Sequence, residues 1–316
     1  MKARIIVLNV DNKLIQVILS DTEMVDAEVA LRELNAKQIK KVSSVELHSI
    51  PTFISGDLNN ASELIISHPD NTTFLSKQTI QPKVARFITP KRYKTKVLRF
   101  CPSSVRETLS SYDRCILGFS LDNRNLEGER LKAVITWINR RFKHCLVLFG
   151  DSIYRHTVQI KTKVDETDAL KQAILLGQRV FEENKPLFED SANACQFEYI
   201  FAQQAQHFPE YAMYCDNLWT LFNENVDFNK GVHEFATYFV NRCHAYSDKN
   251  MHLASAYLIE ELAIFSCLAT RNWPVVVYPG TIGIIEEIAN GHYDALPQEF
   301  KHQLYISLYI KSRGII

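Results

Sequence analysis

The pattern of apolar and polar positions changes near residue 95. Before that point, short β-rich runs and one stretch with helical spacing follow each other closely. The elements predicted there are a hairpin formed by 4–10 and 13–20 around Asp11-Asn12, a helix over 26–41, a strand over 63–69 and a loop around 68–73. We interpret residues 1–95 as a small appended α/β module, and the sequence does not indicate its role.

From residue 112 onward, buried-type strands alternate with amphipathic helices, after a basic stretch at 91–99 that we expect to be a linker. The predicted strands cover 115–119, 145–150, 274–279 and 302–310, and the predicted helices cover 127–142, 167–184, 196–224, 229–245, 249–270 and 281–290. Such alternation predicts a parallel sheet with right-handed crossovers. The fold class is therefore α/β, with a Rossmann-like parallel sheet flanked by helices over residues 96–316.

Composition narrows the class of protein without indicating a reaction. Lys plus Arg and Asp plus Glu number 36 each, so no global charge attracts nucleic acid or a membrane. The seven cysteines are odd in number and contain no C-x-x-C pair, which argues against a disulfide framework and a zinc ribbon. The N-terminal apolar run is short for a secretory signal, and no segment approaches the roughly 20 apolar residues of a membrane span. We expect a cytoplasmic monomer with reduced thiols and no metal.

Several polar residues follow directly at the ends of predicted strands. Ser120, Asp151, Ser152 and Tyr278 all lie at such ends. Ligands of open parallel sheets bind outside the carboxyl ends of the strands. The pattern therefore predicts one shared site at this edge, and it offers Ser120 and Ser152 as alternative nucleophiles.

Ser152 lies in the stretch VLFGDSI, which looks like the first block of GDS-type esterases. A serine acyl-transfer enzyme needs a base that accepts its proton and an oxyanion hole. The D-x-x-H that supplies the base in those enzymes does not occur in this sequence, and neither does their G-x-N-D block. An esterase stays an alternative, and a turn or N-cap role for Ser152 is the simpler interpretation.

Ser120 has no histidine or carboxylate in an obvious triad arrangement, so its substrate must already be activated or must bring its own base. Tyr257 and Glu261 are four residues apart in an apolar helical stretch and share one helix face. A carboxylate there is costly to bury unless it is paired, and beside a phenol it suits a substrate ammonium. The simpler alternatives are a half-buried surface pair for these two and a core position for Tyr278.

Taken together, these pieces resemble the cyclodipeptide synthases. The matching motifs are Gly118-Phe119-Ser120 at a strand end, Tyr257 and Glu261 in a long helix, and Tyr278 at a later strand end. Pro279 is similar to the subgroup with Tyr-Pro (XYP), whereas Asn123 matches the asparagine of the other subgroup. The resemblance covers about 110–312 and implies a fold like class I tyrosyl- and tryptophanyl-tRNA synthetases. H-I-G-H, K-M-S-K-S and P-loop motifs are absent from the sequence, which fits a family that needs no ATP or other cofactor.

The resemblance implies an aminoacyltransferase that makes a cyclic dipeptide from two aminoacyl-tRNAs in a ping-pong mechanism. Ser120 attacks the first ester and forms an aminoacyl-enzyme, a covalent intermediate that divides one difficult step into two. Tyr257 and Glu261 hold the first amino group, and Glu261 helps the second aminoacyl group react to give a dipeptidyl-enzyme. Tyr278 positions groups or relays a proton for cyclisation.

Further residues are expected to contact the substrates. Candidate substrate-binding residues at the strand ends and in the apolar helix are Gly118, Phe119, Asn123, Leu148, Asp151, Leu262 and Pro279. Candidate tRNA-binding cations are Arg140, Arg141, Lys143, Lys171 and Arg179, with the basic stretch 91–99 as an alternative. Binding through phosphate contacts should weaken steeply with salt. A synthetase-like module that binds tRNA without catalysis is the third interpretation.

Overall fold

The computed structural model describes residues 2–11, 13–20, 23–42, 52–54, 63–67, 72–76, 83–84, 88–90, 92–190 and 194–313. The chain divides into two compact units, one formed by Met1–Tyr93 with Ser312–Ile316 and the other by Lys94–Lys311. This division falls close to the boundary that we expect after residue 95. The last residues of the chain belong to the first unit, although nothing in the sequence pattern connects them to it.

The first unit is built on the predicted hairpin. β1 (Lys2–Val10) and β2 (Lys13–Ser20) pair antiparallel, and Val10 lies opposite Lys13 across the turn. The other strands of this unit are β3 (Glu23–Val25), β4 (Ile39–Val42), β5 (Thr52–Ile54), β6 (Glu63–Ser67), β7 (Thr72–Ser76), β8 (Lys83–Val84) and β9 (Ile88–Pro90). β6 confirms the strand expected near 63–69. Part of the loop expected around 68–73, residues 68–71, lies outside the described residues.

The helix predicted over 26–41 is much shorter than its apolar spacing indicates. Asp26 caps α1 (Ala27–Glu33) by accepting hydrogen bonds from Glu28 N and Val29 N. Asn35 has a φ of 48°, which ends the helical path. The following residues form β4, which pairs with β1, so the sheet determines their conformation.

The second unit contains a six-stranded sheet in the order β10-β15-β14-β11-β12-β13. Its strands are β10 (Arg92–Cys101), β11 (Arg114–Phe119), β12 (His144–Phe149), β13 (Gln196–Phe201), β14 (Val275–Tyr278) and β15 (Leu304–Arg313). The pairs from β15 through β13 are all parallel, as predicted. The stretch expected as a linker is the edge strand β10. The stretch 196–201, expected to be helical, is the opposite edge strand β13, whose partly exposed side chains give a weak strand pattern.

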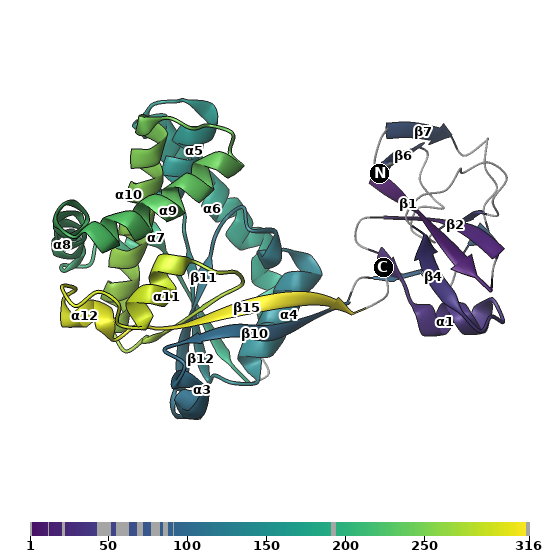
Figure 1. Cartoon of the computed structure of the whole chain (residues 1–316), viewed down its shortest axis with the longest axis horizontal. Helices are drawn as coiled ribbons and strands as arrows, with labels where there is room; N and C mark the ends of the chain where they lie inside the picture. Colours follow the sequence, from purple (N-terminus) through teal and green to yellow (C-terminus); the bar gives the residue numbers. More distant parts are fainter. Residues whose placement is uncertain are drawn as a thin grey trace. The chain divides into compact units, whose positions relative to one another are not determined.

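Helices cover both faces of this sheet (Figure 1). The longer helices are α4 (Gly128–Asn139), α5 (Arg155–Thr162), α6 (Glu166–Glu189), α8 (Tyr211–Glu224), α9 (Val226–Arg242) and α10 (Asp248–Ala269). The shorter ones are α3 (Val105–Thr108), α7 (Ala202–Ala205), α11 (Gly283–Ala289) and α12 (Gln298–Lys301). Alternate residues of β11 point to opposite faces, so Ile116 packs with α10 and Leu117 packs with α4.

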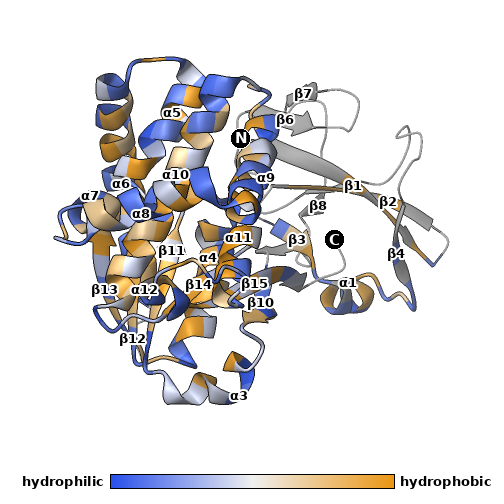
Figure 2. Cartoon of the chain, turned by 60° about the vertical axis from the view of Figure 1, so that its left-hand side comes forward, coloured by the Kyte–Doolittle hydropathy of each residue, from blue (hydrophilic) through white to orange (hydrophobic). Residues whose placement is uncertain are grey.

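α10 is the central helix of the second unit and is apolar on nearly every side (Figure 2). Ser247 caps it by accepting a hydrogen bond from Asn250 N. By length and composition alone this helix could cross a membrane, but 83% of its apolar window is buried within the fold. It therefore serves as the core against which the sheet and the neighbouring helices pack.

Candidate active site

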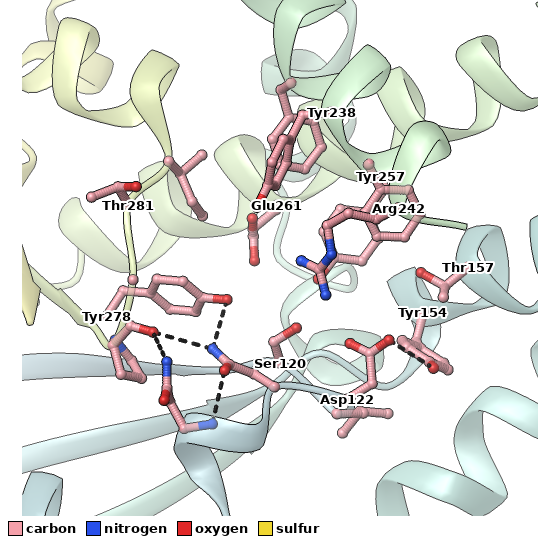
Figure 3. Close-up of a pocket in the computed structure, with 18 of the residues that line it drawn as sticks. Ser120, Asp122, Tyr154, Thr157, Tyr238, Arg242, Tyr257, Glu261, Tyr278 and Thr281 are labelled. Carbon is pink, nitrogen blue, oxygen red and sulfur yellow. Dashed lines mark hydrogen bonds between the residues drawn. The ribbon is translucent and has the colours of Figure 1, made fainter. Parts of the chain in front are cut away.

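A cavity of about 1390 Å³ opens at the carboxyl ends of β11 and β14 (Figure 3). Ser120 follows β11 directly, and Tyr278 is the last residue of β14. Tyr257 and Glu261 extend from α10, one helical turn apart. All four residues line the cavity, so the structure brings together the predicted catalytic set from three separate elements.

The two phenols are held beside the Ser120 hydroxyl. Burial raises the pKa of Tyr257 well above its ordinary value, and a hydrogen bond with Ser120 partly opposes that shift. Burial also raises the pKa of Tyr278 to about 12, and hydrogen bonds with Asn123 and Ser120 oppose it. Both phenols therefore keep their protons near neutral pH. They can donate to an oxygen that develops negative charge next to Ser120.

Glu261 is a buried carboxyl group that forms no ion pair with a described residue. Its side chain points into the cavity (Figure 3), and its Oε2 atom makes no hydrogen bond with any described residue. Burial raises the pKa of Glu261 to about 8. The group is therefore largely protonated near neutral pH. An ammonium group that enters beside it would supply the missing partner, and a pKa near the working pH suits proton transfer.

Asn123 connects the loop after β11 to the end of β14. Its Nδ2 atom donates to Tyr278 Oη at 3.1 Å and to the Pro279 carbonyl at 3.3 Å. Asn125 Nδ2 donates to the same carbonyl at 3.2 Å, and Asn123 Oδ1 accepts from Asn125 N at 3.0 Å. The amide of Asn123 is thus used to hold the Tyr278-Pro279 strand end. This arrangement shows how an asparagine here is compatible with Tyr-Pro.

Other predicted substrate contacts lie away from the cavity wall. Phe119, Leu148 and Leu262 are buried in the two cores on either side of the sheet. A Cβ atom on Gly118 would meet the Tyr278 ring at 3.4 Å, so this glycine faces that ring. Asp151 is buried, accepts a hydrogen bond from Gln203 N at 3.0 Å and packs against Gly177 of α6. Asn123 and Pro279 are the members of the predicted set that line the cavity.

Ser152 lies in a closed polar network behind β12. It is 2% exposed, and its hydroxyl donates to Gln206 Oε1 at 2.8 Å. Gln206 Nε2 donates in turn to Glu260 Oε2 at 3.0 Å. Arg155 donates to both oxygens of the same carboxylate, to Oε2 at 2.9 Å and to Oε1 at 2.6 Å. His156 Nε2 lies 2.9 Å from Glu260 Oε1. These contacts give Ser152 a structural role, and they offer no support to the esterase alternative.

The predicted tRNA-binding cations fall into two groups. Arg140, Arg141 and Lys143 precede β12 and so lie at the amino ends of the strands, opposite the cavity. Arg141 covers the Trp137 ring at 4.3 Å, and Lys143 pairs with Asp113 at 2.9 Å. Lys171 and Arg179 are exposed on α6, the helix that contributes Leu176 to the cavity. The cations of α6 therefore belong to a helix that lines the cavity, whereas those after α4 lie at the other end of the strands.

Several polar residues of the cavity are not among those identified from the sequence. Asp122 Oδ2 accepts from Lys161 Nζ at 2.8 Å and lies 3.4 Å from the Tyr154 hydroxyl. Tyr238 and Arg242 line the cavity from α9. The position of Asp122 near Ser120 was a usable signal, whereas the other residues come from elements without a recognisable motif. Among the described residues, no group of His, Cys, Asp or Glu converges in a way that could hold a metal ion.

The second unit has the fold of the cyclodipeptide synthases, a class I aminoacyl-tRNA synthetase-like α/β fold. A cyclodipeptide synthase from Fluoribacter dumoffii superimposes with a TM-score of 0.62 and 21% identity, over 71% of this chain and 100% of that one. One from Bacillus thermoamylovorans gives 0.57 and 15% identity, over 70% and 96%. A Mycobacterium tuberculosis protein, described as relating cyclodipeptide synthetases to type I tRNA synthetases, gives 0.52 and 11% identity, over 71% and 96%.

Comparison of sequence alone gives no such relative. No family model matches the chain, and no curated protein matches it. The structural likeness at these identities establishes the fold and leaves the reaction to be argued from the cavity.

Proposed function

We propose that this chain is a tRNA-dependent aminoacyltransferase that joins two aminoacyl groups into a cyclic dipeptide. The observation that carries the proposal is the meeting of Ser120, Tyr257, Tyr278 and Glu261 in one cavity without a histidine base. A hydrolase would need a base for Ser120 to attack a stable ester or amide. An aminoacyl ester of tRNA is already activated, and it brings a ribose hydroxyl that can accept the proton.

In the first step, Ser120 Oγ bonds to the carbonyl carbon of the first aminoacyl ester. The carbon–oxygen bond to the ribose breaks, and the serine proton passes to the departing ribose oxygen. The phenols of Tyr257 and Tyr278 can donate hydrogen bonds to the negatively charged oxygen of the tetrahedral intermediate. The product is an aminoacyl-enzyme whose amino group lies beside Tyr257 and Glu261.

In the second step, the amino group of the aminoacyl-enzyme attacks the ester of the second aminoacyl-tRNA. Glu261, in its carboxylate form, accepts the proton that the amine loses, and its raised pKa of about 8 matches that task. The second tRNA departs and leaves a dipeptidyl-enzyme. The terminal amine then attacks the Ser120 ester, and the bond between the carbonyl carbon and Ser120 Oγ breaks to release the cyclic dipeptide. Tyr278 gives its proton to the serine oxygen and takes up the proton that the amine loses.

The Tyr278-Pro279 pair supports placing the chain with the Tyr-Pro subgroup. The subgroup with asparagine is approached only through Asn123, whose amide here serves Tyr278 and the Pro279 carbonyl. The mass of the product in the following experiment names the amino acids that are joined.

The test is incubation of the purified chain with total tRNA charged with isotope-labelled amino acids, followed by mass spectrometry of small molecules and of the intact protein. We expect a cyclic dipeptide mass and an aminoacyl adduct on the protein. Ser120→Ala should abolish both, whereas Ser152→Ala, the matched control at the neighbouring strand end, should retain both. A cyclic dipeptide formed at the normal rate by Ser120→Ala would overturn the assignment of the nucleophile.

A further inference from the structure

An exposed aromatic residue and an arginine stand together at the mouth of the cavity. Tyr238 is 66% exposed although it is a large aromatic residue, and Arg242 follows four residues later on the same face of α9. The Arg242 guanidinium lies 5.8 Å from the centre of the Tyr238 ring. Both side chains line the cavity, and the guanidinium points into it (Figure 3). They are therefore accessible to a ligand that also reaches Ser120.

The charge of Arg242 is not matched within the described part of the chain. Lys161, a second cation of the cavity, is paired with Asp122 at 2.8 Å. Arg242 forms no ion pair with a described residue, and neither does Arg124, which also lines the cavity. Two carboxylates of the cavity have other partners, since Glu234 lies 3.9 Å from Lys230 and Glu287 contacts the Tyr293 hydroxyl. An anionic group on a ligand would therefore form an ion pair with Arg242.

A cluster of three rings packs α9 against α10 beside this pair. The rings of Phe235, Phe239 and Tyr257 are nearly parallel, with interplanar angles of 14–18°, and each centroid lies 6.3–6.5 Å from the other two. Tyr238 is not part of this cluster. The packing therefore fixes the backbone that carries Tyr238 and Arg242 relative to Tyr257, and hence relative to the reacting atoms at Ser120.

We propose that Tyr238 and Arg242 bind the 3′-terminal nucleotides of the aminoacyl-tRNA, with a base stacked on the Tyr238 ring and a phosphate against the Arg242 guanidinium. The proposal rests on the proposed function and specifies its tRNA site. Every base offers a π face to an exposed aromatic ring, and a guanidinium matches a phosphate in geometry and charge. The cavity of about 1390 Å³ is larger than the roughly 300–1,000 Å³ of ordinary small-molecule pockets, which leaves room for nucleotides beside the aminoacyl groups.

The test measures the rate of Ser120 acylation in a single turnover as a function of aminoacyl-tRNA concentration. Tyr238→Ala and Arg242→Ala should each raise the half-saturating concentration about tenfold while the maximal rate stays unchanged, because stacking and phosphate contacts contribute to binding. Tyr238→Phe should restore binding. Arg242→Ala should also reduce the slope of log affinity against log salt by about 1.

Two matched controls lie outside the cavity. Tyr246→Ala removes an aromatic side chain that is 68% exposed, and Arg106→Ala removes an exposed cation of α3. Both should behave as the unaltered protein. An activated ester without nucleotides, the cyanomethyl ester of the same amino acid, should acylate Tyr238→Ala and Arg242→Ala as fast as the unaltered protein.

Two results would overturn the tRNA site. One is unchanged half-saturation in both variants, and the other is an equal defect with the nucleotide-free ester. If the unaltered protein is never acylated, the proposed function fails. The site is then judged by fluorescence anisotropy with uncharged tRNA, in which Tyr238→Ala and Arg242→Ala must weaken binding more than the two controls for the site to stand.

Discussion

Two neighbouring strands of one sheet end in a serine, and the fold treats the two ends in opposite ways. β11 and β12 pair in register from Arg114 opposite His144 to Phe119 opposite Phe149. The end of β11 opens into the cavity, where Ser120 faces two phenols. The end of β12 is filled by a hydrogen-bonded ion network that occupies Ser152. A serine that follows a strand is therefore left facing a cavity or held within the fold according to the side chains that the helices place beside it.

Adjacent residues of α10 make this difference. Glu260 and Glu261 point about 100° apart around the helix, so one reaches each strand end. Hydrogen bonds from His156 and Arg155, and their charges, outweigh burial and lower the pKa of Glu260. Glu261 has no such partner, and burial raises its pKa to about 8. Two carboxyl groups in one turn of helix thus have different environments, one held in an ion network and one facing the cavity without such a network.

The largest expected effect comes from disrupting the ion network at the end of β12. Glu260→Ala should lower the free energy of unfolding by about 3 kcal/mol, because it leaves the largely buried Arg155 guanidinium with the exposed Glu166 carboxylate, at 3.2 Å, as its remaining ion-pair partner. Urea unfolding at pH 7 measures the loss. The neighbouring change Glu261→Gln removes no ion pair and should not destabilise the protein. A loss below about 1 kcal/mol in Glu260→Ala would show that the ion network at the end of β12 contributes little to the stability of the fold.

The pH dependence of stability sharpens the contrast between the two glutamates. The pKa of Glu261 is about 8 in the folded protein and 4.5 ordinarily. Below pH 4.5 this residue is protonated in both the folded and the unfolded chain, so it does not lower the free energy of unfolding. As the pH rises, the unfolded chain releases this proton while the folded protein keeps it. The folded state therefore loses about 1.4 kcal/mol per pH unit, or about 3 kcal/mol by pH 7.

Comparison with Glu261→Gln isolates this contribution. The difference in unfolding free energy between the two proteins should shift by that amount from pH 4 to pH 7 and level off above pH 8, because both states are then ionised. Urea unfolding across this range supplies the measurement. Parallel curves for the two proteins would mean that Glu261 titrates normally in the folded chain.

How much of this could be predicted from the sequence depends on the range of the contacts involved. The parallel strands were predictable because each is a compact apolar run, and strand ends in one sheet meet at one edge. Ser120 and Tyr278 could therefore be placed together, and the spacing of Tyr257 and Glu261 put them on one helix face. The edge strand β13 was not predictable, since its side chains are only partly buried and its stretch continues into helices.

The ion network at the end of β12 could not be predicted from the sequence either. Gln206 and Glu260 come from elements 54 and 104 residues away from the groups that they bind, Ser152 and His156. Nothing in the spacing of these residues indicates that they meet. Apolar residues such as Leu148 and Leu262 were placed in a pocket wall, but the same hydrophobicity buries them in the core.

The smallest expected effect concerns the cavity at the end of β11. Asn123→Ala removes the hydrogen bond to Tyr278 Oη, one to the Pro279 carbonyl and the one that Asn123 accepts from Asn125 N. Asn125→Ala removes the side-chain bond to that carbonyl. Because the loss of one neutral hydrogen bond costs about 1 kcal/mol, Asn123→Ala should slow product formation about fivefold and raise the pKa of Tyr278. Asn125→Ala should change the rate less than twofold. Rates of cyclic dipeptide formation measured with both variants decide between two roles for the Asn123 amide. Equal slowing of both variants would show that Asn123 supports only the end of β14. A slower rate in Asn123→Ala alone would show that the amide orients the Tyr278 phenol toward Ser120.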